Sequence, residues 1–291
     1  FFLSVENGTV ALKPYSTQAI RSGNQELNGT YALTAIENPE TRVVVPPDAL
    51  VMNEFTFETP LVVSDHAVLE FTGGSFYNPS NTGTIIVHTG AELDIQAGFV
   101  QSRRIQLANA AKFEMSGGTL SMAVGSSSPS TVGVYAEHSD ISISGGDLSI
   151  GVLSSHRNTL AISGGDITVA SHAEMRDAVG TISGGMLNIQ ENFPVVDSQL
   201  HLTGGSISIG YRLDVMGGSV IISGDNFNFP SGPMTAESGT VTGILDDGTP
   251  LTFDYQLSQG GTIILNAPEP NASVLTGFCI LAVITIRRRR R

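Results

Sequence analysis

The chain contains no tryptophan, a single cysteine and few charged residues. Its cysteine, Cys279, lies in an apolar segment near the C-terminal end, so the rest of the chain can form neither a disulfide nor a cysteine-based metal site. Charged residues make up only 14% of the sequence, yet apolar residues reach 41%, which excludes a disordered composition. The 33 glycines among 291 residues favour an all-β chain with many turns, organised as one long domain or two ordinary ones.

Positive charge is scarce outside the last five residues. The formal net charge is −13, and without the terminal arginines 9 basic residues stand against 27 acidic ones, a net charge of −18. Such a surface repels nucleic acid and anionic lipid and attracts cations or basic partners. We therefore predict no nucleic-acid partner.

A Ser-Gly-Gly or Thr-Gly-Gly triplet recurs through the middle of the chain. After Gly146 the second glycine of the triplet returns at Gly165, Gly185 and Gly205, and one more step of the same length reaches Asp225, in Ser223-Gly224-Asp225. The step from Gly118 to Gly146 is longer, which predicts an inserted loop. The glycine pairs are Gly73-Gly74, Gly117-Gly118, Gly145-Gly146, Gly164-Gly165, Gly184-Gly185 and Gly204-Gly205.

Polar and apolar residues alternate on both sides of each glycine pair. Leu160 and Ile162 precede one pair, for example, and Ile167 and Val169 follow it. A period of two predicts strands with one buried face, so each copy reads as strand, corner, strand. Glycines at the corner allow a positive φ or a close approach of two backbones.

Short strands repeated about every 20 residues predict a parallel β-helix, or β-solenoid, whose coils pair about 4.8 Å apart. A β-sandwich is the alternative, but it does not explain the constant interval. We expect two inward columns, one of Leu120, Leu148, Ile167, Leu187, Ile207 and Phe227 and the other of Met122, Ile150, Val169, Ile189, Ile209 and Phe229.

The repeat divides the chain into four segments. Residues 1–60 lack the repeat and are predicted to cap the coils of residues 61–235. In residues 236–266, the turn Asp246-Asp247-Gly248-Thr249 and the segment Thr262–Leu265 predict two closing hairpins that would cover the open end. Residues 267–291 form a separate tail.

Outward residues on the expected solenoid also stack in rows, and one row contains Asp147 and Asp166 on adjacent coils. Two carboxylates this close would share a cation or raise one pKa. Pectinolytic β-helix enzymes use acidic residues on such a face, so a polysaccharide-active lyase or hydrolase is one alternative function. The strand offers no neighbouring basic residue for an anion clamp, and two solvated acids are the simpler interpretation, so we predict no catalytic residues.

Two binding functions also remain open. Ice-binding solenoids present flat, threonine-rich lattices, but here the rows are interrupted by charge and by Met186. Glycan-binding faces commonly expose aromatic rings, and here Tyr77, Tyr135 and Tyr211 are scattered.

The six histidines show no metal-ligand spacing, although His138 and His156 could approach each other from neighbouring coils. The sequence has no Gly-x-Ser-x-Gly nucleophile elbow, and its glycine pairs lack the lysine of a phosphate-binding loop. We predict neither a metal site nor a cofactor. The histidines are His66, His88, His138, His156, His172 and His201.

The C-terminal tail combines three elements in a fixed order. Pro268-Glu269-Pro270 keeps the chain extended, and an uncharged apolar run from Ala272 to Ile286 follows. This run is shorter than the ~20 residues of a relaxed bilayer crossing, so it predicts a transmembrane-like helix that is marginal as a permanent anchor. The terminal arginines should remain cytoplasmic and leave the body outside; they are Arg287, Arg288, Arg289, Arg290 and Arg291.

This tail resembles the PEP-CTERM sorting signal, a tail type also described as an ice-binding protein C-terminal domain. The resemblance covers residues 268–291, and it departs from the commoner form in having Ala267 before the first proline. It implies export, transient insertion in the inner membrane and cleavage near Pro268–Pro270 by an exosortase-type enzyme. A simple C-terminal membrane anchor is the alternative.

Export also requires an N-terminal signal, whereas the sequence starts Phe1-Phe2-Leu3 without methionine or a basic region. We therefore expect that the chain is truncated or processed at its start. Taken together, the sequence predicts a secreted β-solenoid with a structural or adhesive role at the cell surface or in the extracellular matrix, where polysaccharide is a possible partner.

Overall fold

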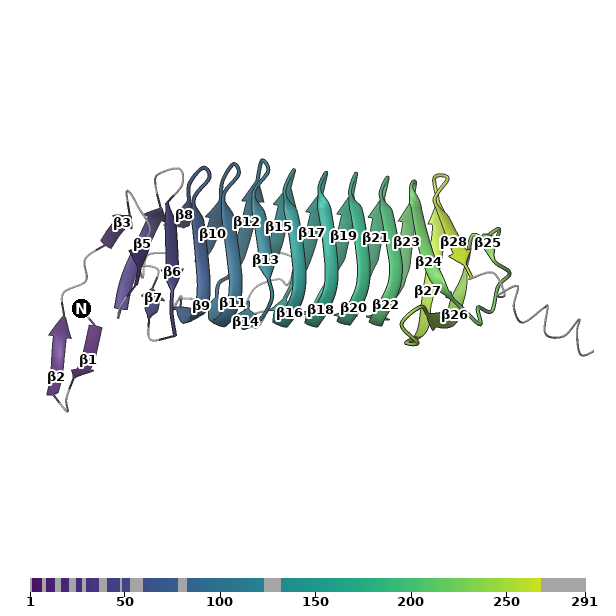
Figure 1. Ribbon diagram of the computed structural model, residues 1–291. Coiled ribbons are helices and arrows are strands. Elements are labelled where there is room, and N and C mark those ends of the chain that lie inside the picture. Colours follow the sequence, from purple (N-terminus) through teal and green to yellow (C-terminus); the bar gives the residue numbers. More distant parts are fainter. Residues whose placement is uncertain are drawn as a thin grey trace, which may run out of the picture.

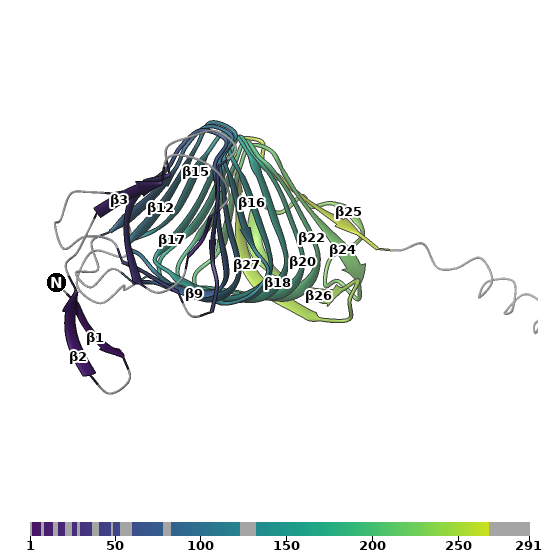
Figure 2. The ribbon, with the colours of Figure 1, turned by 60° about the vertical axis from the view of Figure 1, so that its left-hand side comes forward.

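The computed structural model describes residues 2–6, 9–13, 17–20, 25–27, 30–36, 41–47, 49–52, 60–77, 83–122 and 132–267. These residues form an all-β protein dominated by one long, mostly parallel sheet, which confirms the all-β prediction and is consistent with a solenoid. Figures 1 and 2 show its strands stacked as successive coils. The Pro268–Pro270 motif, the apolar run and the terminal arginines lie outside the described residues.

Each coil has three faces, defined by which strands pair with which. The first face precedes the glycine corner, the second face follows it, and the third face consists of shorter strands that lead to the next coil. Six strands run through the corner and belong to both the first and the second face: β9 (Val68–Tyr77), β11 (Glu92–Gln101), β16 (Asp140–Ile150), β18 (Thr159–Val169), β20 (Val179–Ile189) and β22 (Gln199–Ile209).

One coil is divided at its corner into β13 (Lys112–Met115) and β14 (Thr119–Ser121), and β24 (Ser219–Asp225) ends at the corner. The third face is built by β8 (Leu61–Val63), β10 (Thr84–Val87), β12 (Arg104–Ala108), β15 (Gly133–Glu137), β17 (Val152–His156), β19 (Ala173–Arg176), β21 (Phe193–Val196) and β23 (Leu213–Met216).

The parallel pairing keeps the interval seen in the sequence. Leu148 is the register partner of Ile167, which in turn pairs with Leu187, and Leu187 pairs with Ile207. All four side chains are at most 7% exposed, so the first predicted column is inward over these coils. Met122, Ile150, Val169 and Ile189 are buried in the same way and form the second column.

Each of the two corner positions requires glycine, and a different constraint is decisive at each. The second glycine has a positive φ, for example +88° at Gly165, which a residue with a side chain rarely adopts. The first glycine packs against the preceding coil, and a Cβ on Gly164 would lie 2.2 Å from the carbonyl oxygen of Ser144. The coils can therefore approach to ladder distance at the corner only because neither residue has a side chain.

A column of small inward residues lies where the third face turns into the next coil. The residue before each of them has a positive φ, as at His138, Asp177 and Asp197. Ser198 shows how its polar members are satisfied, since its hydroxyl donates to the Val196 carbonyl at 2.7 Å and accepts the Ala178 N–H at 2.9 Å. The column includes Ala67, Ala91, Ala111, Ser139, Ala178 and Ser198, all buried.

The last copy of the repeat departs from the prediction. β24 ends at Asp225, and Asn226, which follows, has a φ of +51°. Phe227 and Phe229 therefore do not continue the inward columns but are partly buried against the core, and the Phe229 ring meets Tyr255 edge-on at 6.4 Å between centroids. Replacement of the second glycine by Asp225 marks the point at which the regular coil stops.

The C-terminal strands are β25 (Gly232–Pro233), β26 (Ser238–Leu245), β27 (Pro250–Ser258) and β28 (Thr262–Asn266). β26 and β27 pair antiparallel around the Asp246–Thr249 turn. β28 does not form the expected second hairpin of this kind: it pairs in parallel with β24, and β27 pairs in parallel with β23, so both strands add to the coils. β28 also pairs antiparallel with β25.

Parallel pairing also extends into the segment before residue 61. β6 pairs with the first half of β9, and β7 pairs with its second half. β3 and β4 pair with β5 and β6, and an antiparallel hairpin of β1 and β2 precedes them. Their bounds are β1 (Phe2–Glu6), β2 (Thr9–Lys13), β3 (Thr17–Ile20), β4 (Gln25–Glu26), β5 (Thr30–Ile36), β6 (Arg42–Val45) and β7 (Leu50–Met52).

Candidate functional site

The acidic pair predicted from the repeat lies on the second face. Asp147 and Asp166 are register partners on adjacent strands, followed by Met186 and Ser206 in the same row. Both carboxylates are exposed, which is the environment of solvated acids. Within the described ranges no group of three or more histidine, aspartate, glutamate or cysteine side chains could hold a metal ion.

The middle coils present small hydroxyl side chains around the corner. Ser144, Ser163 and Ser183 are exposed just before their glycine pairs. Beyond the corner, Ser149 pairs with Thr168, which pairs with Asn188. These rows form a shallow polar surface rather than a pocket.

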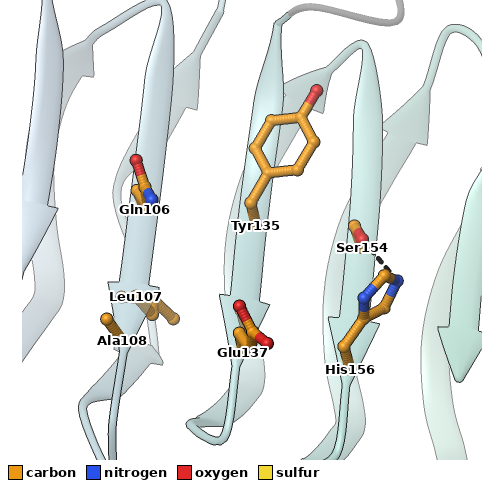
Figure 3. Close-up of a pocket in the computed structure, with 8 residues that line it drawn as sticks. Gln106, Leu107, Ala108, Tyr135, Glu137, Ser154 and His156 are labelled. Carbon is orange, nitrogen blue, oxygen red and sulfur yellow. Dashed lines mark hydrogen bonds between the residues drawn. The ribbon is translucent and has the colours of Figure 1, made fainter.

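A depression of about 180 Å³ lies on the third face, across β12, β15 and β17 (Figure 3). Two outward rows line it. The first row is Gln106, Tyr135 and Ser154, and the second is Ala108, Glu137 and His156, each in register across the three strands. The inward residues Leu107 and Ala136 complete the lining.

Ser154 and His156 at one side of the depression belong to a charged network. The Ser154 hydroxyl lies 3.2 Å from Nε2 of His156, and the Glu174 carboxylate lies 3.5 Å from the same nitrogen. Arg176 donates a 2.7 Å hydrogen bond to Glu174. Burial raises the pKa of Glu174, but the Arg176 hydrogen bond and the charge of His156 more than offset this, so its pKa lies below the ordinary value of 4.5.

This network is not a serine-hydrolase relay. In such a relay the serine and the carboxylate contact opposite ring nitrogens, so that the histidine can pass a proton between them. Here both contacts are made to Nε2 of His156, so Glu174 cannot orient the ring for Ser154. These contacts hold the His156 ring in place.

Tyr135 forms the aromatic wall of the depression. The guanidinium of Arg104, on the preceding strand of the face, lies 4.8 Å from the centre of its ring. Burial raises the pKa of the Tyr135 phenol, and the nearby Arg104 opposes that rise. The phenol therefore stays protonated at neutral pH and can donate a hydrogen bond.

Sequence analysis names Tyr135 and His156, but it does not predict that they lie in one site. Tyr135 was one of three scattered tyrosines, and the histidine pair is close in the backbone, since the His138 N–H donates to the His156 carbonyl at 2.9 Å. Ser154, Gln106 and Glu137 were missed because the third-face strands lie between the glycine repeats and have no repeat of their own. The available signal was the recurrence of a polar residue two positions before Glu137 and His156.

Comparison of the chain with protein-family models, curated proteins and solved structures found no match. Among the described residues, no helix is both long and apolar enough to cross a bilayer.

Proposed function

We propose that this chain is an exported, exosortase-sorted β-solenoid with a structural or adhesive role at the cell surface or in the extracellular matrix. Its body is a parallel β-helix with roughly 20 residues per coil, and its tail forms a short membrane-inserted helix before cleavage. The observation that carries the proposal is the order of Pro268–Pro270, the uncharged run to Ile286 and the terminal arginines.

The body suits a structural role for physical reasons. Every coil is held to the next by ladder hydrogen bonds and a continuous apolar core, so the stack forms an elongated element. Its outward rows continue in register over many coils, which favours contact with an extended polymer. The net charge of −18 without the tail arginines keeps such a body soluble and away from anionic lipid.

Intact mass and C-terminal peptide mapping test the proposal on protein recovered from its native cells, with membrane and extracellular fractions kept separate. We expect a mature form that ends near Pro268–Pro270 and lacks the arginines. Recovery of the chain only with Arg291 intact in the membrane would overturn the sorting role and make the tail a simple anchor.

A further inference from the structure

The depression on the third face results from a short side chain between longer ones. Ser154 points outward from its strand but is only 7% exposed, because Tyr135 precedes it in the row and His156 and Glu174 lie beside it. Ala108 provides a second low point beside the longer Glu137. The floor lies at Leu107 and Ala136, between the row that contains Tyr135 and the row that contains Glu137 and His156 (Figure 3).

The polar groups of the depression are those that recognise hydroxyl-rich ligands. Gln106 offers an amide, which both donates and accepts, and Glu137 offers an acceptor. His156 is restrained by its contacts with Ser154 and Glu174. Tyr135 combines an apolar ring edge with a hydroxyl, which suits a ligand with apolar C–H faces and polar edges.

We propose that this depression is a glycan-binding subsite that holds a sugar unit of a neutral, extended polysaccharide. The row of Gln106, Tyr135 and Ser154 runs across adjacent coils, so a chain lying along the solenoid axis would meet a new set of polar groups at each coil. This inference rests on the proposed surface role, because it needs the body to lie where polysaccharide is present.

The charged groups around the depression favour a neutral polymer over a polyanion. Glu137 and Glu174 stand close to the floor, and Arg176 and His156 are already engaged with Glu174. Arg104 lies over the Tyr135 ring. The cations of the site are thus committed to protein partners, and the strongly negative body adds repulsion against acidic chains.

Native affinity electrophoresis of the full chain in mild detergent tests the proposal. The gels contain hydroxyethylcellulose, galactomannan or alginate, and retardation is measured against polymer concentration. We expect one of the two neutral polymers to retard the wild-type chain. Tyr135→Ala should weaken its binding at least about tenfold, since buried aromatic contacts dominate recognition, whereas Tyr135→Phe should retain most of it.

Tyr211→Ala is the matched control, because Tyr211 is 60% exposed and also lies near an arginine, with the Arg212 guanidinium 5.0 Å from its ring centre. It should bind like the wild type. Ala108→Gln fills the low point beside Glu137 without removing a binding group and should weaken binding as well, which gives a second variant if Tyr135→Ala does not fold.

Failure of both neutral polymers to retard the wild type, retardation by alginate alone, or equal binding by Tyr135→Ala and Ala108→Gln would overturn the glycan site. A mature end near Pro268–Pro270 in a protein that binds no polymer would leave the sorting role standing and remove only this site. An uncleaved chain that binds a neutral polymer would do the reverse.

Discussion

At the residue scale, the corner glycines show that one repeated pair can meet two unrelated constraints. Gly164 is needed because the preceding coil leaves no room for a Cβ, whereas Gly165 is also needed for its positive φ. At Gly184-Gly185 and Gly204-Gly205 the first glycine likewise faces a carbonyl oxygen. The second combines a φ of +80° or more with backbone atoms less than 3 Å from the position of a Cβ.

We predict that Gly164→Ala destabilises the protein by about 3 kcal/mol or more, because the new methyl group would overlap the backbone of the adjacent coil. Gly248→Ala is the control for angle strain alone: Gly248 has a φ of +86° and no atom within 4 Å of the position of a Cβ. It should lose only about 1–2 kcal/mol. Chemical denaturation measures both, and equal losses would contradict the role assigned to Gly164.

Ile167→Asp should abolish cooperative folding, because Ile167 is 0% exposed and the new carboxylate would be buried without a partner. Ala161→Asp lies on the same strand but is exposed, so it should change the free energy of unfolding by no more than about 0.5 kcal/mol. Thermal unfolding followed by circular dichroism compares the two variants. A mild effect at Ile167 would mean that this column faces solvent.

At the scale of elements, the first and second faces could be predicted from the sequence and the third could not. β18 alternates through Leu160, Ile162, Ile167 and Val169, so its inward side can be assigned from its period. In β17, by contrast, four consecutive residues from Val152 to Ser155 are buried, and β21 contains Pro194. These two strands give no periodic signal. β12 and β15, which carry the rest of the candidate site, do alternate, but each has only five residues and lies outside the glycine repeat.

The contact between β17 and β19 should make stability depend on pH. The folded pKa of Glu174 is depressed, so its contribution is present above the unfolded value of about 4.5 and is lost as pH falls through the folded pKa. Glu174→Gln should therefore lower stability at pH 7, and the difference from the wild type should shrink in acid. Denaturation midpoints from about pH 6 to about pH 3 measure this effect.

Glu92 on β11 provides a control of opposite sign. Burial and the nearby Glu114 raise its pKa, so its ionised form is unfavourable in the folded state. Glu92→Gln should stabilise the protein at pH 7, and that gain should disappear as pH falls below about 4.5. The same direction of change in both variants would contradict the assignments of Glu92 and Glu174.

At the scale of the whole molecule, the repeat interval determines which residues of neighbouring coils pair. Pairing at the C-terminal end of the stack is not set by the repeat. The constant spacing of the glycine pairs places Leu187 on Ile207, as the sequence indicates. It could not predict that β27 and β28 continue the stack after the irregular stretch from Asn226, because their alignment with β23 and β24 depends on long-range pairing and not on a repeat.

Deletion of residues 180–199 removes one full coil, since Gly180 is the register partner of Leu200. We predict that the shortened chain keeps a β-rich circular dichroism spectrum and cooperative unfolding, because nearest-neighbour contacts are restored across the junction. Deletion of residues 180–189 removes half a coil and brings first-face residues against third-face residues. Retained cooperativity in that variant would contradict the pairing described here.

The parallel ladders also determine how the molecule responds to tension. A pull on the two ends of the chain loads the hydrogen bonds of the outermost coil first, because each coil is bonded only to its neighbours. The protein should then unspool one coil at a time, each step releasing about 70 Å of chain for ~20 residues of extended backbone. A tether of this kind lengthens in equal steps under load and keeps its remaining coils folded while the first ones yield.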